Sequence, residues 1–473
     1  MLSIIFILSV FLCKKNYPTS IKFIDRFKFY GLTVNDQEVN VKIANILKPN
    51  KKWLVASVLL ITACAGVATG QIATQPGGER VEEITPNPTV IQESTPENTS
   101  ETIPTETPTQ AGIPKVLPDL LPDEPPPSGA ERQFSTDFSK HTVPYVEILS
   151  GGPPKDGIPA IEDPKFISVA EADQYLEDLE PVIFFQIGDD VRAYPLQILT
   201  WHEIVNDVVD GKPVTVTFCP LCNTAIAFDG TFEGQVLDFG TTGRLRFSNL
   251  IMYDRQTETW WQQATGEGIA GEFTGKQLTF LPASIIGWGE FKESFPDGQV
   301  LSRDTGFPRD YGRNPYAGYD NINNSPFLFR GPRTPGVLPA MARVLTVELN
   351  EEAVAYPYDV LQEQGAINDT VSGNEIVILW QPGTASALDA SRIADGEDVG
   401  AGASFFREVD GQILTFSYDG EKIIDDQSGS EWDVFGQAVS GELTGSQLEP
   451  VVSVNHFWFS WAAFRPETRI YES

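Results

Sequence analysis

The alternation of hydrophobic and polar positions from about residue 180 onward predicts a β-rich structure. Apolar runs flank two turn signals, Gly188-Asp189-Asp190 and Asp210-Gly211, an arrangement that is typical of hairpins. The predicted strands are residues 182–187, 191–194, 205–209, 213–218, 225–228, 236–239, 249–253 and 259–263. Strands and helices do not alternate regularly, which argues against a doubly wound parallel sheet.

Two helices interrupt these strands. The first covers residues 196–201, after Pro195 at its first turn, and the second covers residues 283–295, ending before Pro296. The pattern therefore indicates a β-rich α+β protein in which most strands are antiparallel.

An internal repeat organises the C-terminal two thirds of the chain. Ala193-Tyr194-Pro195 recurs as Ala355-Tyr356-Pro357, 162 residues later, and Asn206-Asp207 recurs at the same offset. Farther on, Asp254 and Trp260 are matched with Asp426 and Trp432. We therefore expect two tandem homologous units about a pseudo-twofold axis, with Tyr194 on Tyr356 and Trp260 on Trp432. Each unit contains two helices.

These observations divide the chain into five parts. They are residues 1–63, a signal or anchor region; 64–133, a Thr/Pro/Glu-rich disordered tether; 134–302, the first repeat; 303–337, a linker; and 338–473, the second, degenerate repeat. The linker is too long to be a simple connector. It is interpreted as a wrapped structural belt, with a lid over the site as the alternative.

The N-terminal region resembles the export signal of a bacterial lipoprotein. Lys48, Lys51 and Lys52 precede an apolar stretch at residues 53–62, and residues 61–64 read I-T-A-C. By this resemblance Cys64 is the lipidated residue, and the protein is attached to the cell membrane on its extracytoplasmic face. Translation from Leu47 would give an ordinary signal peptide, and a two-segment membrane anchor is the alternative.

Composition limits the possible partners. The formal net charge is −32 and the sequence pI is about 4.4. Such acidity argues against binding nucleic acid through a basic patch. Only Cys219 and Cys222 remain as cysteines of the folded part, which is too few for a disulfide framework.

One constellation is a candidate for chemistry: Cys219, Cys222, His202 and Glu203. The Asp210-Gly211 hairpin should bring the end of the first helix beside the Cys-x-x-Cys, so we predict an imidazole nitrogen of His202 within hydrogen-bonding or metal-sharing distance of a thiol. Glu203 is expected to point away, since neighbours on an extended chain face opposite sides. All four positions differ in the second repeat.

Two functions and a bland alternative fit these residues. Cys219 and Cys222 are a thiol redox pair in the first, with His202 stabilising or deprotonating a thiol and Glu203 orienting the ring. In the second, the thiols and His202 bind copper or zinc, with Glu203 or Met252 as a further ligand. The third possibility is an inert disulfide. The partner is a redox or metal-delivery protein of unknown identity.

The other histidines rank lower. His456 lies in the aromatic run V-N-H-F-W-F-S-W and is interpreted as core, although pseudo-symmetry could bring it near the site. His141 is interpreted as a surface residue at the edge of the folded region.

Several long motifs carry a family resemblance. They are AYPLQILTWHEIVND, VTVTFCPLCNTAIAFD, MYDRQTETWWQQATGEGIAG and DTGFPRDYGRNPYAGYD, followed by QPGTASALD and FWFSWAAFRP. In this order they resemble the bacterial and archaeal domain-of-unknown-function family 3179, over nearly everything from residue 138 onward. The resemblance implies an exported protein, often a lipoprotein, and implies little about the reaction.

Overall fold

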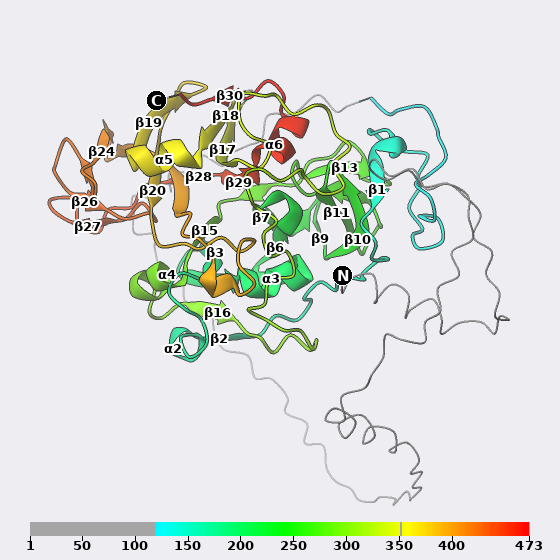
Figure 1. Ribbon diagram of the computed structural model, residues 1–473, viewed down its shortest axis with the longest axis horizontal. Helices are drawn as coiled ribbons and strands as arrows, with labels where there is room; N and C mark the ends of the chain where they lie inside the picture. Colours follow the sequence, from blue (N-terminus) through cyan, green and yellow to red (C-terminus); the bar gives the residue numbers. More distant parts are fainter. Residues whose placement is uncertain (1–118, 351, 473) are drawn as a thin grey trace, which may run out of the picture. The chain divides into compact units, whose positions relative to one another are not determined.

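The computed structural model describes residues 119–350 and 352–472. Strands make up 39% and helices 12% of the structure, and most of the sheets are antiparallel, so the predicted β-rich α+β class is confirmed. Figure 1 shows the sheet that contains β10 and β11 at one end of the molecule and the sheet that contains β24 and β26 at the other. The predicted export signal, Cys64 and Leu47 lie outside the described residues.

Residues 119–302, called the first half below, form three main sheets. In spatial order, the first contains β15 (Ser284–Gly287), β3 (Pro181–Ile187), β4 (Asp190–Pro195), β16 (Gln299–Leu301) and β2 (Phe166–Ser168). The second contains β14 (Phe280–Leu281), β7 (Thr224–Asp229), β6 (Lys212–Cys219) and β5 (Ile204–Val209). The third contains β1 (Ile148–Ser150), β10 (Phe239–Arg246), β11 (Asn249–Asp254), β12 (Trp260–Gln262) and β13 (Glu267–Ala270).

Residues 338–472, called the second half, also form three main sheets. They are β29 (Ser453–Phe457), β17 (Arg343–Leu349), β18 (Glu352–Pro357) and β30 (Arg469–Ile470); β19 (Ala366–Val371), β20 (Asn374–Gln381), β21 (Ala401–Phe406) and β28 (Pro450–Val451); and β24 (Phe416–Tyr418), β25 (Ile423–Asp425), β26 (Glu431–Trp432) and β27 (Ala438–Ser440). Two further hairpins pair β8 (Thr231–Phe232) with β9 (Gln235–Val236), and β22 (Glu408–Val409) with β23 (Gln412–Ile413).

The helices are short and lie at the ends of strands. They are α2 (Val169–Ala172), α3 (Leu196–His202), α4 (Trp288–Ser294), α5 (Tyr358–Gln364) and α6 (Trp458–Phe464), with 3-10 turns η2 (Tyr145–Glu147), η3 (Pro220–Cys222) and η4 (Ile393–Asp395). No helix in residues 119–350 or 352–472 is long and apolar enough to cross a membrane.

Both predicted hairpins are present, as β3–β4 and β5–β6. The predicted helix at residues 283–295 is too long, because Ser284–Gly287 pairs with β3 as a strand and the helix begins at Trp288. The strand predicted at 236–239 is displaced, since β10 begins at Phe239. Sequence reasoning also missed α2, although Ser168 and Glu171 form the capping box that announces it.

The predicted match of the tryptophans is wrong by one residue. Trp261 Nε1 donates to Asp254 Oδ2 at 2.8 Å, and Trp432 Nε1 donates to Asp425 Oδ2 at 3.0 Å. Trp261, not Trp260, therefore has the environment of Trp432, and Asp425, not Asp426, has that of Asp254. Asp425 stands next to Asp426, and Trp260 next to Trp261, so matching by identical letters could not distinguish these neighbours.

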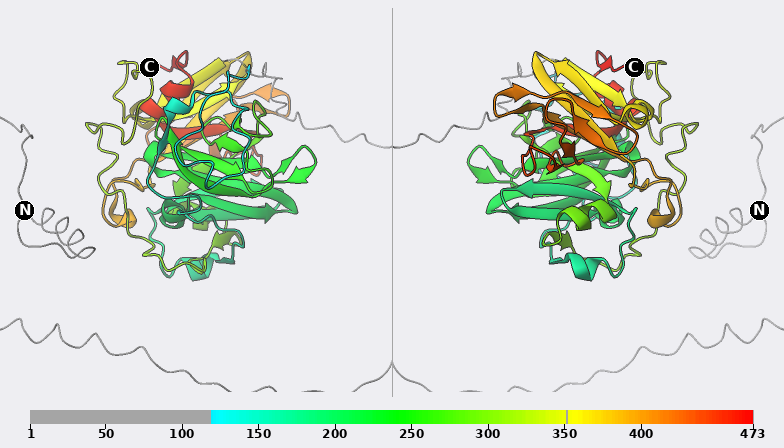
Figure 2. Two further views of the ribbon diagram at one scale, coloured as in Figure 1. Left: turned by 90° about the vertical axis from the view of Figure 1, so that its right-hand side faces the viewer. Right: turned by 90° about the vertical axis from the view of Figure 1, so that its left-hand side faces the viewer.

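The two halves pack against each other through two shared clusters of buried side chains. One cluster of buried side chains joins Phe218 and Trp261 of the first half to Phe457 and Phe459 of the second. A second cluster joins Trp288 to Leu379 and Phe405. Figure 2 shows the strands of the two halves stacked against each other, with the first half in green and the second in yellow to orange.

Part of the predicted tether packs against the first half. The Leu121 amide donates to the His141 carbonyl at 2.9 Å, and Ala130 is fully buried. His141 itself is buried, stacks on Tyr145 at 4.3 Å between ring centroids, and bonds Val143 O through Nδ1 at 3.0 Å. The interpretation of His141 as a surface residue is therefore wrong, because residues 119–133 cover this edge.

Candidate functional site

The Cys-x-x-Cys forms a tight turn between two antiparallel strands. Cys219 ends β6, Pro220 begins the single turn η3, and Asn223 takes a left-handed conformation with φ 52°. The chain then enters β7, where Thr224 pairs with Cys219. The turn holds the two cysteines 3.6 Å apart as free thiols. Cys219 therefore ends a strand, one residue beyond the predicted strand at 213–218, and does not begin an α-helix.

Both thiols are buried. Cys219 Sγ donates to the Ser248 carbonyl at 3.8 Å. Burial, followed by the neighbouring Cys222 and by Glu203, raises the pKa of Cys219 well above its usual value of 9.0. Cys219 is therefore protonated at neutral pH, and its oxidation must remove a proton.

Glu203 is the acidic residue beside the thiols. It ends α3 in a left-handed conformation (φ 60°, ψ −27°), held by bonds from its amide to Leu199 O and from the Phe218 amide to its carbonyl, each 2.8 Å long. The side chain is 8% exposed and has no hydrogen-bond partner among the described residues. Burial raises the pKa of the carboxyl group from 4.5 to about 8, so it is mostly protonated at neutral pH.

The position of Glu203 corrects one expectation. Its carboxyl group acts electrostatically on both Cys219 and Tyr316, so it lies on the same side as the thiols instead of pointing away. The prediction assumed an extended chain with alternating sides, whereas a left-handed residue turns its side chain out of that alternation.

His202 does not contact the thiols, and the prediction that it would is wrong. Its Nδ1 is 2.7 Å from Pro159 O, and its Nε2 is 2.7 Å from the Tyr311 hydroxyl. Burial lowers the pKa of the ring. Both nitrogens are occupied because residues 159–161 lie along β5 and the linker folds back over α3. His202 therefore fixes the linker in place.

The predicted metal ligands are not assembled. In the part of the chain that the structure describes, no group of three or more His, Cys, Asp or Glu side chains could hold a metal ion. His202 is bonded elsewhere, and Met252 is buried in β11 opposite Trp261. The site therefore offers two thiols and a carboxyl group, without the imidazole that the copper or zinc hypothesis required.

A cavity of about 430 Å³ lies over the thiol turn. Glu203 forms part of its wall, and so does Leu221, which stands between Cys219 and Cys222 in the turn. The other lining residues are Gly151, Pro153, Ile158, Thr241, Gly243, Arg244, Leu245, Leu250, Pro315, Tyr316, Ala317, Gly318, Tyr319 and Phe327. Because six of these belong to residues 303–337, the linker covers the site.

The linker is tied down on both sides of this cavity. Tyr319 donates from its hydroxyl to Leu221 O at 3.0 Å, in the thiol turn itself. On the other side, the Asn314 amide donates to Ser391 O at 2.9 Å and the Tyr319 amide to Leu388 O at 3.2 Å. The sequence analysis treated the linker as a belt or a lid and did not assign its tyrosines to the site. The signal that could have found them was the number of tyrosines, at 311, 316 and 319, in so long a connection.

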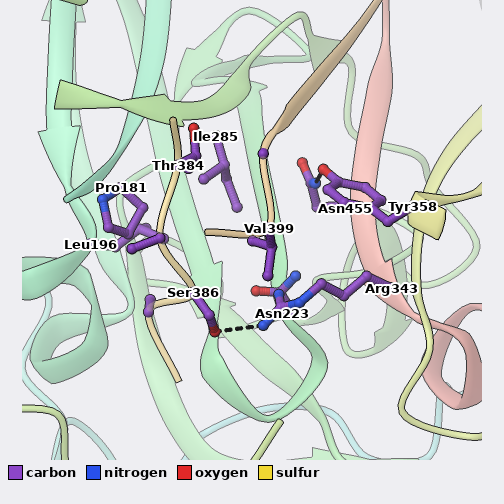
Figure 3. A pocket seen from close by; sticks show the side chains of 13 residues that line it. Pro181, Leu196, Asn223, Ile285, Arg343, Tyr358, Thr384, Ser386, Val399 and Asn455 are labelled. Atoms are coloured by element: carbon purple, nitrogen blue, oxygen red, sulfur yellow. Dashed lines mark hydrogen bonds between the residues drawn. The ribbon is translucent and has the colours of Figure 1, made fainter. Parts of the chain in front are cut away.

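A second, much smaller cavity lies behind the turn. Its volume is about 20 Å³, and Asn223 lines it together with Arg343 and Asn455 of the second half. Figure 3 shows Arg343 directed toward Ser386, to which its Nη2 donates at 2.5 Å. The same Nη2 is 2.5 Å from the Asp320 carboxylate of the linker. This ion pair joins the linker, at Asp320, to the second half.

His456 of the second half reaches the strand that leaves the turn. Its Nδ1 is 2.8 Å from Thr224 Oγ1, and its ring packs on Trp461 with 5.0 Å between centroids. Burial lowers the pKa of His456 to about 3, so the ring is neutral. It is a core residue, as the aromatic run indicated, and it also supports β7 behind Cys222.

The described chain thus has a β-rich fold with a dithiol turn under a linker-covered cavity. The family described as "Protein of unknown function (DUF3179)" matches residues 155–468, and the chain belongs to this family. No curated protein and no solved structure matches it.

Proposed function

We propose that Cys219 and Cys222 are a thiol redox pair that serves an acceptor bound in the covered cavity. The observation that carries the proposal is the pair itself: two free thiols 3.6 Å apart, next to a protonated and unpaired Glu203. On oxidation two S–H bonds break and one S–S bond forms, while two electrons and two protons leave. Glu203 exchanges one of these protons, since its pKa of about 8 suits a group that gives and takes protons near neutral pH.

The test is reversible oxidation of the folded protein. Diamide should convert both thiols to a Cys219–Cys222 disulfide. The readouts are the loss of two titratable thiols and a decrease in mass by two hydrogen atoms. Dithiothreitol should restore the thiols without unfolding the protein. Cys222→Ser should leave Cys219 unable to form the intramolecular bond. Thiols that stay reduced in the folded wild type would reject the proposal, and an oxidised pair that resists reductant would favour the inert disulfide.

We also propose that the two halves are copies of one unit. Apart from the edge strands β1 and β2 of the first half, the three sheets have the same strand order in both halves. Equivalent bonds recur: Tyr194 donates to Asp207 at 2.7 Å and Tyr356 to Asp369 at 2.8 Å. Likewise, Asn206 and Asn368 each bond a strand of the third sheet through both side-chain atoms. The test is to superpose one half on the other in an experimental structure. Different strand paths in the two halves would overturn this proposal.

The location of the protein is a further proposal. The lipoprotein-like signal at residues 61–64 supports cleavage before Cys64 and attachment to the outer face of the cell membrane. Cys64→Ala should release the protein from the membrane fraction. An unmodified N-terminus upstream of residue 47 in cells would contradict it.

A further inference from the structure

The cavity wall presents two hydroxyl groups that have no acceptor. Glu203 and Tyr316 both line the cavity, and neither side chain has a hydrogen-bond partner in residues 119–350 or 352–472. Both groups belong to the wall of the same cavity. A polar group that faces a cavity bonds to water or to a bound ligand. The ligand should therefore offer acceptor oxygens.

The remainder of the wall is largely apolar. Ile158, Leu221, Leu245 and Leu250 line the cavity from the first half, and the rings of Tyr319 and Phe327 line it from the linker. A volume of about 430 Å³ suits a small organic molecule and is too small for a protein segment with its own disulfide. Charged or zwitterionic disulfides are poor candidates, because an apolar wall would not compensate the loss of their hydration.

Arg244 lines the cavity, but its charge is directed elsewhere. Its guanidinium group donates to Ser128 O at 2.7 Å and lies 6.0 Å from the centre of the Trp260 ring. Arg244 pairs with Ile251 across the sheet, whereas the adjacent pair of Leu245 and Leu250 faces the other side and lines the cavity. The wall therefore favours an uncharged ligand.

The thiols lie immediately behind this wall. Leu221, which stands between the two cysteines in the turn, lines the cavity, and both cysteines are buried. Cys219 also acts electrostatically on Tyr316 and Tyr319, two other lining residues. A ligand in the cavity therefore lies next to the dithiol turn.

We propose that the cavity binds a quinone, with its carbonyl oxygens accepting hydrogen bonds from Glu203 and Tyr316, and that the reduced thiol pair converts it to the hydroquinone. This inference rests on the proposed thiol redox function. The step is balanced: two S–H bonds break and one S–S bond forms, and two electrons and two protons pass to the quinone, whose two carbonyl oxygens become hydroxyl groups.

Duroquinone is a suitable probe, because all its ring positions carry methyl groups and thiols cannot add to an open carbon. The full chain, reduced and freed of reductant, should convert one equivalent of duroquinone while losing two thiols. The Cys219→Ser/Cys222→Ser variant should still bind duroquinone in equilibrium dialysis but should not reduce it. Durene, which has the same shape without carbonyl groups, should bind at least about fivefold more weakly, since the hydrogen bonds are lost.

Variants test where the quinone binds. Ile158→Trp should fill the cavity and abolish both binding and reduction, while diamide still oxidises the thiols. Ala317→Trp, in the linker that covers the cavity, should have the same effect on binding and reduction. With two variants, the test does not depend on the folding of either one. Val146→Trp, at a side chain that is 82% exposed and outside the cavity, is the matched control and should behave like the wild type.

The outcomes separate the two proposals. If diamide cycles the thiols but the double serine variant binds no duroquinone, or binds it no better than durene, the quinone proposal is overturned and the redox pair stands. If Ile158→Trp and Ala317→Trp reduce duroquinone like Val146→Trp, the reaction takes place outside the cavity and the proposal is overturned. If the thiols do not cycle at all, the redox function itself fails.

Discussion

The ends of helices α3 and α5 have the same backbone and different side chains. Each helix is seven residues long, follows a proline, and ends in a left-handed residue, Glu203 with φ 60° and Gly365 with φ 65°. Glycine takes this conformation freely, whereas another residue loses about 1–2 kcal/mol. At this helix end the strain is therefore present only in the half that has a carboxyl group beside its thiols.

The adjoining turns differ in the same way. Cys219 to Cys222 form a 3-10 turn, whereas Gln381 to Thr384 form none and Gly383 has φ 109°. The scaffold bonds from Tyr194 and Tyr356 are nevertheless alike. The comparison teaches that this backbone forms with or without the cysteines and the carboxyl group, as the proposed redox role of these residues requires.

The largest expected effect is at Gly365. Gly365→Glu should destabilise the protein by more than about 3 kcal/mol, because a Cβ at this position would overlap the Tyr418 ring and the backbone is left-handed. Chemical denaturation of this variant and the wild type measures the difference. A loss below about 1 kcal/mol would show that the two helix ends are interchangeable after all.

The second largest effect is expected at the two buried aspartates, Asp254 and Asp425. Asp254→Ala and Asp425→Ala should each cost about 3 kcal/mol, since each carboxylate accepts bonds from a backbone amide and a tryptophan. Asp426→Ala, at an exposed neighbour, is the control and should cost less than about 0.5 kcal/mol. Equal losses at Asp425 and Asp426 would contradict the corrected match between the halves.

Glu203 should also make stability depend on pH. Because its folded pKa is about 8 and its usual value 4.5, the folded state keeps a proton that the unfolded state loses. Stability should therefore fall as pH rises from 4.5 to about 8, by at most about 1.4 kcal/mol per unit, and level off above. Chemical denaturation of the wild type and of Glu203→Gln at several pH values measures the difference in their free energies of unfolding, which isolates this group. A difference that does not change with pH would mean that Glu203 has the usual pKa of a carboxyl group.

The smallest expected effect is a stabilisation of the protein by Glu203→Gly. Relief of the left-handed strain should raise the free energy of unfolding by about 1 kcal/mol, while quinone binding and thiol oxidation slow. Gly211→Ala, at another left-handed position that is remote from the site, should instead destabilise. A Glu203→Gly protein that is less stable than the wild type would show that the carboxyl group contributes to the fold.

Local signals predicted the hairpins and the end of β6 at Cys219, because turn residues and apolar alternation determine them directly. They did not predict which side chains meet over the thiols. Tyr316 and Tyr319 come from the linker, about 100 residues away, and Glu203 faces the thiols only because of one left-handed backbone angle. His202 was assigned to the thiols from hairpin geometry alone, without knowledge that Pro159 and Tyr311 bond both its nitrogens.

The reduction potential of the Cys219–Cys222 pair in the folded protein tests the central claim most directly. Equilibration with thiol–disulfide buffers of graded composition, followed by acid trapping and mass spectrometry, gives the fraction oxidised. A working redox pair predicts a single reversible two-electron transition above roughly −300 mV. A potential below that value, or no reversible transition, would mark a structural disulfide or inert thiols and would contradict the account.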